Sequence, residues 1–277
     1  MNAMKIENLV RDYGGGKGVF DVSFHVDQGE AFGFLGPNGA GKTTTIRHLM
    51  GFLKPKSGSC TINGLDCWRE RDKVQARLGY IPGEISFFED ISGAEFLKFI
   101  AQYRGIGSQT RKEDLLERFE LDPKSKIKKM SKGMKQKLGI VAAFMHDPDI
   151  LILDEPTSGL DPLMQNRFID LVAEEKKQGK TILMSSHMFE EVERTCDRIG
   201  IIRTGRMVAV DAAAALRERH TRSYTVTLEN ESAAEAFAAD FNGVRDGLKV
   251  TVTTKQSLEE IFMNYYGGEK HDEHGAV

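Results

Sequence analysis

The sequence has few cysteines and no excess of charge of either sign. Cys60, Cys67 and Cys196 are too few and too irregularly spaced for a disulfide framework or a zinc site. We therefore expect reduced, structural thiols, as in the cytosol. The 277 residues include 38 Lys and Arg against 41 Asp and Glu, which gives a formal net charge of -3. This balance argues against bulk binding of nucleic acid, which usually needs a basic excess.

Long apolar runs are also missing. The longest, Leu138 to Met145, has eight residues, whereas a helix needs roughly 18 to cross a bilayer. The first ten residues carry Lys5 and Glu7 and lack the apolar centre of a signal peptide. We therefore expect a cytoplasmic protein. A content of 40% hydrophobic and 29% charged residues is typical of a folded globular protein, and the length allows one or two domains.

Strand-like and helix-like patterns alternate over the first 210 residues, which indicates an α/β fold. A helix is predicted from Pro162 to Gln178, because proline suits a first helical turn and Gly179 follows the end. Strands are expected at 22–26, 31–35, 150–153 and 181–184, and further parallel-sheet-like strands at 198–203 and 206–209.

Two segments depart from this alternation. Residues from about 86 to 148 have apolar side chains at helical spacing and no good strand, so we expect a helical insert. The composition shifts at Asp211, and a small second α+β unit is expected over 211–266. Its predicted strands lie near 224–228 and 250–252, and its helices near 232–241 and 258–265. Residues 267–277 are predicted to be disordered.

A glycine-rich segment between a predicted strand and a predicted helix fits the phosphate-binding pattern G-x-x-x-x-G-K-[ST]. Glycines let successive backbone N–H groups face an anion, and the following helix directs its positive end to the same point. Lys42 supplies a cation for the phosphates and Thr43 a hydroxyl for Mg²⁺. We expect the nucleotide to contact Gly36, Pro37, Asn38, Gly39, Ala40, Gly41, Lys42, Thr43 and Thr44. The motif alone does not separate an ATPase from a GTPase or a kinase.

Two adjacent acids follow the apolar run at 150–153. Successive side chains at a strand end point to opposite faces, so Asp154 and Glu155 can have different roles. A buried carboxylate needs a cation or a hydrogen bond, and Mg²⁺ would compensate Asp154. Glu155 would then face the γ-phosphate and orient or deprotonate the attacking water.

A third motif, at 129–137, completes a resemblance. Together with the two motifs above it is similar to the ATP-binding subunits of ABC transporters, whose signature is L-S-G-G-Q. Ser131 and Gly133 match this signature, whereas Lys132 and Met134 depart from it. From the residues alone, Ser131 can cap a helix whose free N–H groups bind an anion. For the neighbouring lysines the alternative is a solvated basic face or a patch that binds acidic lipid.

The resemblance covers about residues 4 to 210 and implies further roles. Asp161 ends a segment similar to the D-loop, His187 stands at the switch histidine, and Tyr13 stands where an aromatic ring stacks on adenine. The implied fold is a P-loop ABC cassette with a helical insert and an antiparallel β subdomain, followed here by the small α+β unit. The implied ligands are ATP and Mg²⁺.

The resemblance also implies partners. Two copies would form a head-to-tail homodimer in which Lys42 of one subunit and Ser131 of the other hold each ATP. An integral membrane permease would carry the transport path, and the subunit would sit on the inner face of the membrane without nucleic acid. The segment 257–262 resembles the extension of drug and antibiotic exporter ATPases, which favours export. The alternatives are a soluble ABC-type ATPase that acts on ribosomes or nucleic acid, and a scaffold that barely hydrolyses ATP, against which Glu155 argues.

One departure from the family pattern concerns the metal site. The family usually has glutamine after Pro82, a position that Gly83 occupies here. Glu84 is next in line and could serve as the metal ligand, or the loop could keep only a mechanical role. Phe87 and Phe88 follow, either as part of a groove for a permease helix or as a satellite core contact.

Overall fold

The computed structural model describes residues 2–215 and 221–255, and the chain divides into two compact units, Met1–Val210 and Asp211–Val277. The first unit contains a six-stranded sheet with the strand order β10-β9-β3-β8-β7-β6. Its strands are β3 (Ala31–Leu35), β6 (Leu78–Ile81), β7 (Ile150–Asp154), β8 (Thr181–Ser186), β9 (Arg198–Arg203) and β10 (Arg206–Ala212).

The centre of this sheet is parallel and buried. β3, β7 and β8 contain only buried residues, which explains their continuous apolar sequences. The parallel register places Asp154 opposite Ser185 at the ends of β7 and β8. The prediction of a parallel-type strand at 206–209 was wrong, because the two-residue connection between β9 and β10 permits only an antiparallel hairpin.

A four-stranded sheet with the order β2-β1-β4-β5 forms a separate layer of the first unit. Only one of its strands, at 22–26, was predicted by position. The strands are β1 (Asn2–Gly14), β2 (Lys17–Asp27), β4 (Ser57–Ile62) and β5 (Leu65–Asp66). All its pairings are antiparallel. Met4, Phe24 and Cys60 from this sheet share a buried core with Ile46 and Leu49.

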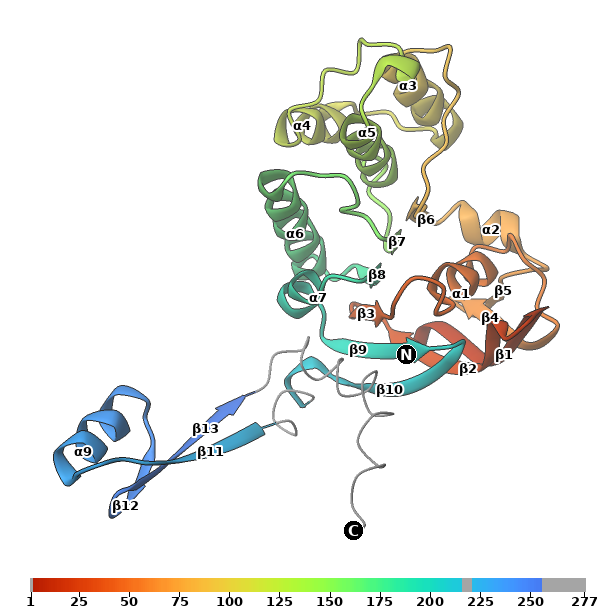
Figure 1. Cartoon of the computed structure of the whole chain (residues 1–277). Coiled ribbons are helices and arrows are strands. Elements are labelled where there is room, and N and C mark those ends of the chain that lie inside the picture. Colours follow the sequence, from red (N-terminus) through yellow and green to blue (C-terminus); the bar gives the residue numbers. More distant parts are fainter. Residues whose placement is uncertain (1, 216–220, 256–277) are drawn as a thin grey trace. The chain divides into compact units, whose positions relative to one another are not determined.

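Helices cover both faces of the parallel sheet (Figure 1). α1 lies on one face, whereas α6 and α7 lie on the other. Asp161 caps α6 by accepting a hydrogen bond from the N–H of Met164. The bounds are α1 (Lys42–Leu49), α2 (Arg71–Gln75), α6 (Pro162–Lys177) and α7 (Phe189–Thr195).

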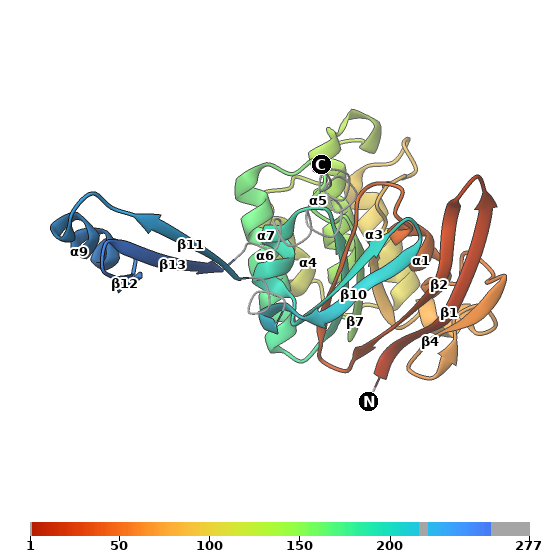
Figure 2. The same cartoon turned by 60° about the horizontal axis from the view of Figure 1, so that its bottom comes forward.

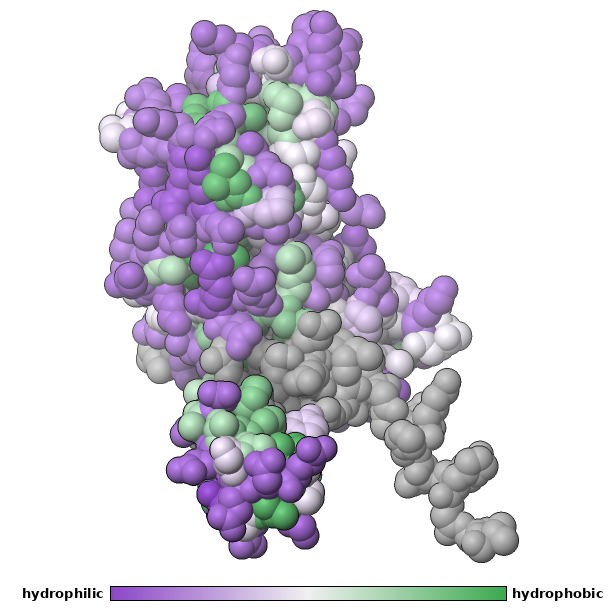
Figure 3. Space-filling view, turned by 60° about the vertical axis from the view of Figure 1, so that its left-hand side comes forward, coloured by the Kyte–Doolittle hydropathy of each residue, from purple (hydrophilic) through white to green (hydrophobic). Residues whose placement is uncertain are grey.

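The segment between β6 and β7 is helical, as expected. It contains α3 (Gly93–Arg104), α4 (Thr110–Arg118), the 3-10 turn η1 (Ile127–Lys129) and α5 (Lys132–Phe144). Ser92 and Glu95 form a reciprocal capping box at the start of α3. On the side that comes forward in Figure 3, the surface near α4 and α6 is mostly hydrophilic. Arg118 on α4 forms an ion pair with Glu174 on α6 over 2.6 Å.

The second unit contains a three-stranded antiparallel sheet with the order β11-β13-β12. Its elements are β11 (Thr221–Thr227), α9 (Glu231–Asp240), β12 (Val244–Asp246) and β13 (Lys249–Lys255). Asn230 caps α9, which packs on the sheet and buries Ala234 and Val250 (Figure 2). The helix predicted at 258–265, the exporter-like segment 257–262 and the tail predicted to be disordered lie outside the described residues.

The structure also bears on the small number of cysteines and on the lack of long apolar runs in the sequence. The three cysteines are free and buried, and burial raises the pKa of Cys60 and Cys196 to about 12. Within residues 2–215 and 221–255, no helix has the length and apolar character needed to traverse a bilayer.

Candidate functional site: a phosphate cradle beside two acids

The glycine-rich segment connects β3 to α1 and has the backbone that the motif requires. Gly39 and Gly41 have φ angles of 81° and 111°, which glycine adopts without steric cost. A Cβ on Gly41 would lie 2.8 Å from Cγ1 of Val19. The N–H of Ala40 donates to the carbonyl oxygen of Pro37 over 3.1 Å, which closes the turn ahead of α1. Backbone N–H groups and the start of the helix thus face the same space.

Lys42 is the cation of this loop, and it is 4% exposed. Its ammonium group donates to the carbonyl oxygen of Gly36 over 2.6 Å and lies 3.3 Å from Oε1 of Glu155. The hydrogen bond positions the charge across the mouth of the loop, and the ion pair links the loop to the end of β7. A phosphate bound here would meet a lysine that is already oriented.

The residues around this lysine enclose a cavity of about 390 Å³. Tyr13 reaches it from the end of β1, with its ring 51% exposed and the guanidinium of Arg11 5.3 Å from the ring centre. The lining residues are Tyr13, Lys17, Gly18, Pro37, Asn38, Gly39, Gly41, Lys42, Thr43, Thr44 and Glu155. The cavity therefore brings together the predicted cradle, the aromatic ring and one of the two acids.

Asp154 is completely buried beneath this site. Its Oδ1 atom accepts a hydrogen bond from the hydroxyl of Ser185, whereas Oδ2 is buried without a hydrogen-bond partner. A buried carboxylate oxygen without a partner is costly, and a hard divalent cation would compensate it. The residues present therefore fit Mg²⁺, with Asp154 and the hydroxyl of Thr43 as the groups that would hold it.

Glu155 points in a different direction because its backbone turns sharply. Its φ angle of 47° is left-handed, and its N–H donates to the carbonyl oxygen and the hydroxyl of Ser185, each over 3.1 Å. The carboxylate lies between two other candidate residues. Oε1 is 3.3 Å from Nζ of Lys42, and Oε2 is 3.6 Å from Nδ1 of His187, whose side chain is 55% exposed. The structure thus brings the predicted base and the predicted switch histidine together.

The signature residues lie in a second cluster. Ser131 caps α5 by accepting from the N–H of Met134 over 3.2 Å, and Lys132 donates to the hydroxyl of Ser158 over 3.1 Å. A Cβ on Gly133 would lie 2.9 Å from the carbonyl oxygen of Gly159. The signature therefore packs on the D-loop-like turn that ends at Asp161. Among the described residues, the lining of the cavity includes neither Ser131, Gly133 nor Asp161.

Glu84 is exposed on the loop after β6. The backbone of Gly83 approaches Asp154, since a Cβ on Gly83 would lie 3.1 Å from Oδ2 of this acid. The assignment of Glu84 as a metal ligand stays a prediction.

Two buried polar residues near the site, Ser185 and Glu191, were not predicted, and Gln136 was predicted only as part of the signature motif. Ser185 contacts both acids, Gln136 donates to the carbonyl oxygen of Pro156 over 2.5 Å, and Glu191 accepts from Thr157 and Ser186. The pKa of the Glu191 carboxyl is raised because the group is buried. Ser186 lies five positions before Glu191, but the other partners are 20 to 34 positions away in the chain, so spacing gave little signal of these contacts.

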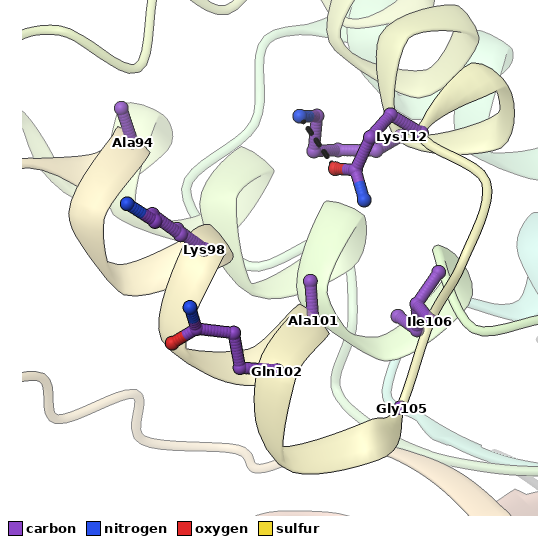
Figure 4. A pocket seen from close by; sticks show the side chains of 8 residues that line it. Ala94, Lys98, Ala101, Gln102, Gly105, Ile106 and Lys112 are labelled. Atoms are coloured by element: carbon purple, nitrogen blue, oxygen red, sulfur yellow. Dashed lines mark hydrogen bonds between the residues drawn. The ribbon is translucent and has the colours of Figure 1, made fainter.

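Another cavity, of about 550 Å³, lies between α3 and α4 (Figure 4). Lys98, Gln102 and Lys112 line it among small or apolar residues, and Lys112 donates to Gln109 over 2.8 Å. None of the described residues that line this cavity is acidic, and it contains no glycine-rich turn before a helix. It therefore does not compete with the cradle as a nucleotide site.

Comparison with known proteins agrees with this geometry. Residues 19–158 match the family described as ABC transporter. The chain is 36% identical over 254 residues to the linearmycin resistance ATP-binding protein LnrL of Bacillus subtilis, a match that covers 90% of this chain and 82% of LnrL. It is 37% identical over 236 residues to the bacitracin transport ATP-binding protein BcrA of Bacillus licheniformis, covering 83% and 76% of the two chains.

A solved structure of an ATP-binding subunit of an ABC transporter is also similar. It has a TM-score of 0.72 and 34% sequence identity, and the match covers 78% of this chain and 92% of that one. The predicted fold class, a P-loop cassette with a helical insert and an antiparallel subdomain, is confirmed. The chain therefore belongs to the ABC transporter family as an ATP-binding subunit, and it is an ATPase.

Proposed function

We propose that the chain hydrolyses ATP with Glu155 as the general base, in a homodimer that drives a separate permease. The observation that carries the proposal is the position of the Glu155 carboxylate between Lys42 and His187 at the edge of the cavity. Lys42 and the loop N–H groups bind the phosphates. Glu155 orients the attacking water and accepts its proton, while His187 stabilises the γ-phosphate. Mg²⁺, held by Asp154 and Thr43, would neutralise phosphate charge.

The homodimer is supported by the separation of the two clusters. Within the described residues, Ser131 and Gly133 do not line the cavity that holds Lys42. The N–H groups at the start of α5 nevertheless form an anion site, since Ser131 leaves the first turn accessible. A head-to-tail partner would place its Ser131 and Gly133 on the γ-phosphate, with Asp161 and its turn beside them. ATP then joins the two copies, and hydrolysis loosens them.

A permease partner is supported by an apolar groove between the parallel sheet and the helical insert. The groove has a volume of about 310 Å³, and its lining includes Phe52, Tyr80, Phe87 and Tyr103. Phe87 also packs edge-on against Phe96, with 4.8 Å between the ring centres, whereas Phe88 is 68% exposed outside the groove. A helix of an integral membrane protein fits this groove, which would hold the subunit at the cytoplasmic face of the membrane.

Export is the direction that the relatives favour. One is named for linearmycin resistance and the other for bacitracin transport. We infer that the permease exports an antibiotic or a related compound.

The Glu155→Gln variant tests the base. It keeps the shape of the side chain but cannot accept a proton, so we expect turnover to fall at least about 100-fold with ATP still bound and the dimer accumulating. Turnover and dimer mass are measured by phosphate release and by light scattering. Glu190→Gln is the matched control, because the Glu190 side chain is 77% exposed and lies 4.0 Å from Arg194 in a loose ion pair. Normal hydrolysis by Glu155→Gln would overturn the assignment.

Affinity purification from detergent-solubilised membranes tests the partner. We expect an integral membrane protein to be recovered with the wild-type chain and to be lost with Tyr103→Asp, since Tyr103 lines the groove. Val244→Asp serves as the control, because Val244 is 75% exposed in the second unit. Recovery of ribosomes by the wild-type chain would instead favour the soluble ATPase.

A further inference from the structure

The turn that follows Glu155 is bound from the side of α7 by a buried acid. The hydroxyl of Thr157, two residues after Glu155, donates to Oε1 of Glu191. Thr157 is 4% exposed and Glu191 is 2% exposed, so solvent does not compete for this bond. Hydrogen bonds to a charged acceptor in a buried setting are the stronger ones. The position of the Glu155 turn therefore depends on Glu191.

The second oxygen of the same carboxylate binds the segment that carries His187. The hydroxyl of Ser186 donates to Oε2 of Glu191 over 2.7 Å, and the N–H of Met188 donates to the same hydroxyl oxygen over 2.8 Å. His187 lies between these two residues. One carboxylate thus joins the segment after the proposed base to the segment around the switch histidine.

Glu191 itself is held firmly. The hydroxyl of Thr195 donates to its carbonyl oxygen over 2.7 Å. The next residue, Val192, is fully buried against β3, where a Cβ on Gly33 would overlap its Cγ1 atom. The carboxylate therefore cannot follow a displaced loop, and instead determines where both loops lie.

Packing alone does not explain an acid at this position. Burial raises the pKa of Glu191, with an opposing effect from the hydroxyls of Thr157 and Ser186, so ionisation in this place is costly. An amide of the same shape would fill the same volume. What the carboxylate provides is two acceptor oxygens and no donor, which fixes both hydroxyls as donors toward it.

We infer that Glu191 is a positioning residue for ATP hydrolysis, which holds the Glu155 turn and the His187 segment at the separation that brings both side chains to one point. This inference rests on the proposed role of Glu155. The 3.6 Å approach of His187 to Glu155 is the geometry that it maintains. Glu191 contacts neither of these side chains by hydrogen bond, so its effect passes through Thr157 and Ser186.

The test compares Glu191→Gln with Glu190→Gln, its exposed neighbour on the same helix. The amide keeps the shape but offers only one acceptor, so one hydroxyl loses its acceptor and must either reverse the direction of its hydrogen bond or break it, and its loop shifts. We expect kcat to fall roughly 10-fold to 100-fold, as for small misplacements of catalytic groups, while the affinity for ATP changes less than about twofold. Glu190→Gln should match the wild type in both.

Two further variants separate positioning from simple loss of structure. Thr157→Val and Ser186→Ala each remove one of the hydroxyl donors, and each should lower kcat with ATP affinity retained. Adding Glu191→Gln to Thr157→Val should cost less than the sum of the single effects, because both act through one contact. These variants keep the inference testable if Glu191→Gln does not fold.

Several results would overturn the inference. They are an unchanged kcat in Glu191→Gln, a fall in ATP affinity equal to the fall in kcat, or additive effects in the double variant. A loss of activity that only parallels a lower melting temperature, and that is recovered when the assay temperature is lowered, would show that Glu191 has a purely structural role. Failure of the proposed function is distinguishable, since Glu155→Gln would then hydrolyse ATP normally whatever Glu191 does.

Discussion

The α-carbon of Gly83 lies against the carboxylate of Asp154, so that a Cβ at position 83 would be 3.1 Å from Oδ2. This oxygen is the buried one without a hydrogen-bond partner. The family usually has glutamine where this chain has glycine. The loop after β6 therefore approaches the proposed metal site with its backbone, so closely that even a methyl group at position 83 would crowd the acid.

Gly83→Ala tests this close approach. A Cβ at 3.1 Å from Oδ2 is tight, and the neighbour must give way by a few tenths of an ångström. We expect the Mg²⁺ concentration for half-maximal ATPase activity to rise several-fold, with little change in melting temperature. Gly107→Ala is the control, since nothing lies within 4 Å of its added Cβ. Equal Mg²⁺ dependence in both variants would show that Gly83 does not border the metal.

Lys42→Ala tests the phosphate cradle. The side chain is buried and bonded to the carbonyl oxygen of Gly36, so that its charge is fixed at the loop. Hydrogen bonds to charged groups contribute about 1.5–3 kcal/mol, and we expect ATP affinity to fall roughly 10-fold or more. Titration with a fluorescent ATP analogue measures it, with Lys73→Ala as an exposed control. Unchanged affinity would refute the cradle.

Gly33→Ala tests the packing of α7 on β3. The added Cβ would overlap Cγ1 of Val192 and lie 3.3 Å from Sγ of Cys196. Overpacking of a core typically costs about 1–3 kcal/mol, measured as the free energy of unfolding in urea. The double variant Gly33→Ala/Val192→Ala should be more stable than the sum of the single changes indicates, because Val192→Ala removes the Cγ1 atom that the added Cβ at position 33 would overlap. Additive destabilisation would show that the two sites are not in steric contact.

Stability should fall in mild acid because of one buried histidine, His48, and one partly buried histidine, His146. Burial, and after it the charge of Arg104, lowers the pKa of His146, and burial also lowers that of His48. The unfolded chain takes up these protons near pH 6.5, whereas the folded chain takes them up only at lower pH. The contribution of the two neutral histidines to stability is therefore complete above about pH 6.5 and is lost as the pH falls toward 5.

His146→Gln isolates this effect. The amide can still donate to the carbonyl oxygen of Leu78, which the ring nitrogen of His146 contacts over 3.2 Å. We expect the melting temperature of the variant to change less between pH 7 and pH 5 than that of the wild type. The comparison cancels other titrating groups, including Glu191, whose raised pKa acts in the opposite direction. Parallel pH profiles would show that His146 is not the source.

The local motifs were predictable because their chemistry is contiguous. The cradle needs glycines, a lysine and a hydroxyl within eight positions, flanked by one strand and one helix, and all of these are neighbours in the chain. Asp154 and Glu155 were predictable in the same way, as adjacent acids after a buried strand. The order β10-β9-β3-β8-β7-β6 was not, since strand order and register arise from pairings between distant segments.

By itself the sequence determined which residues form the cradle and the acidic pair, and which family they indicate, because backbone geometry over a few residues decides them. Only the tertiary structure decided what surrounds them. Ser185 lies beside Asp154 because two parallel strands pair in that register, and Glu191 meets Thr157 because α7 packs on β3. Buried hydrogen bonds of this kind follow from the packing of whole layers, so no spacing along the chain encodes them.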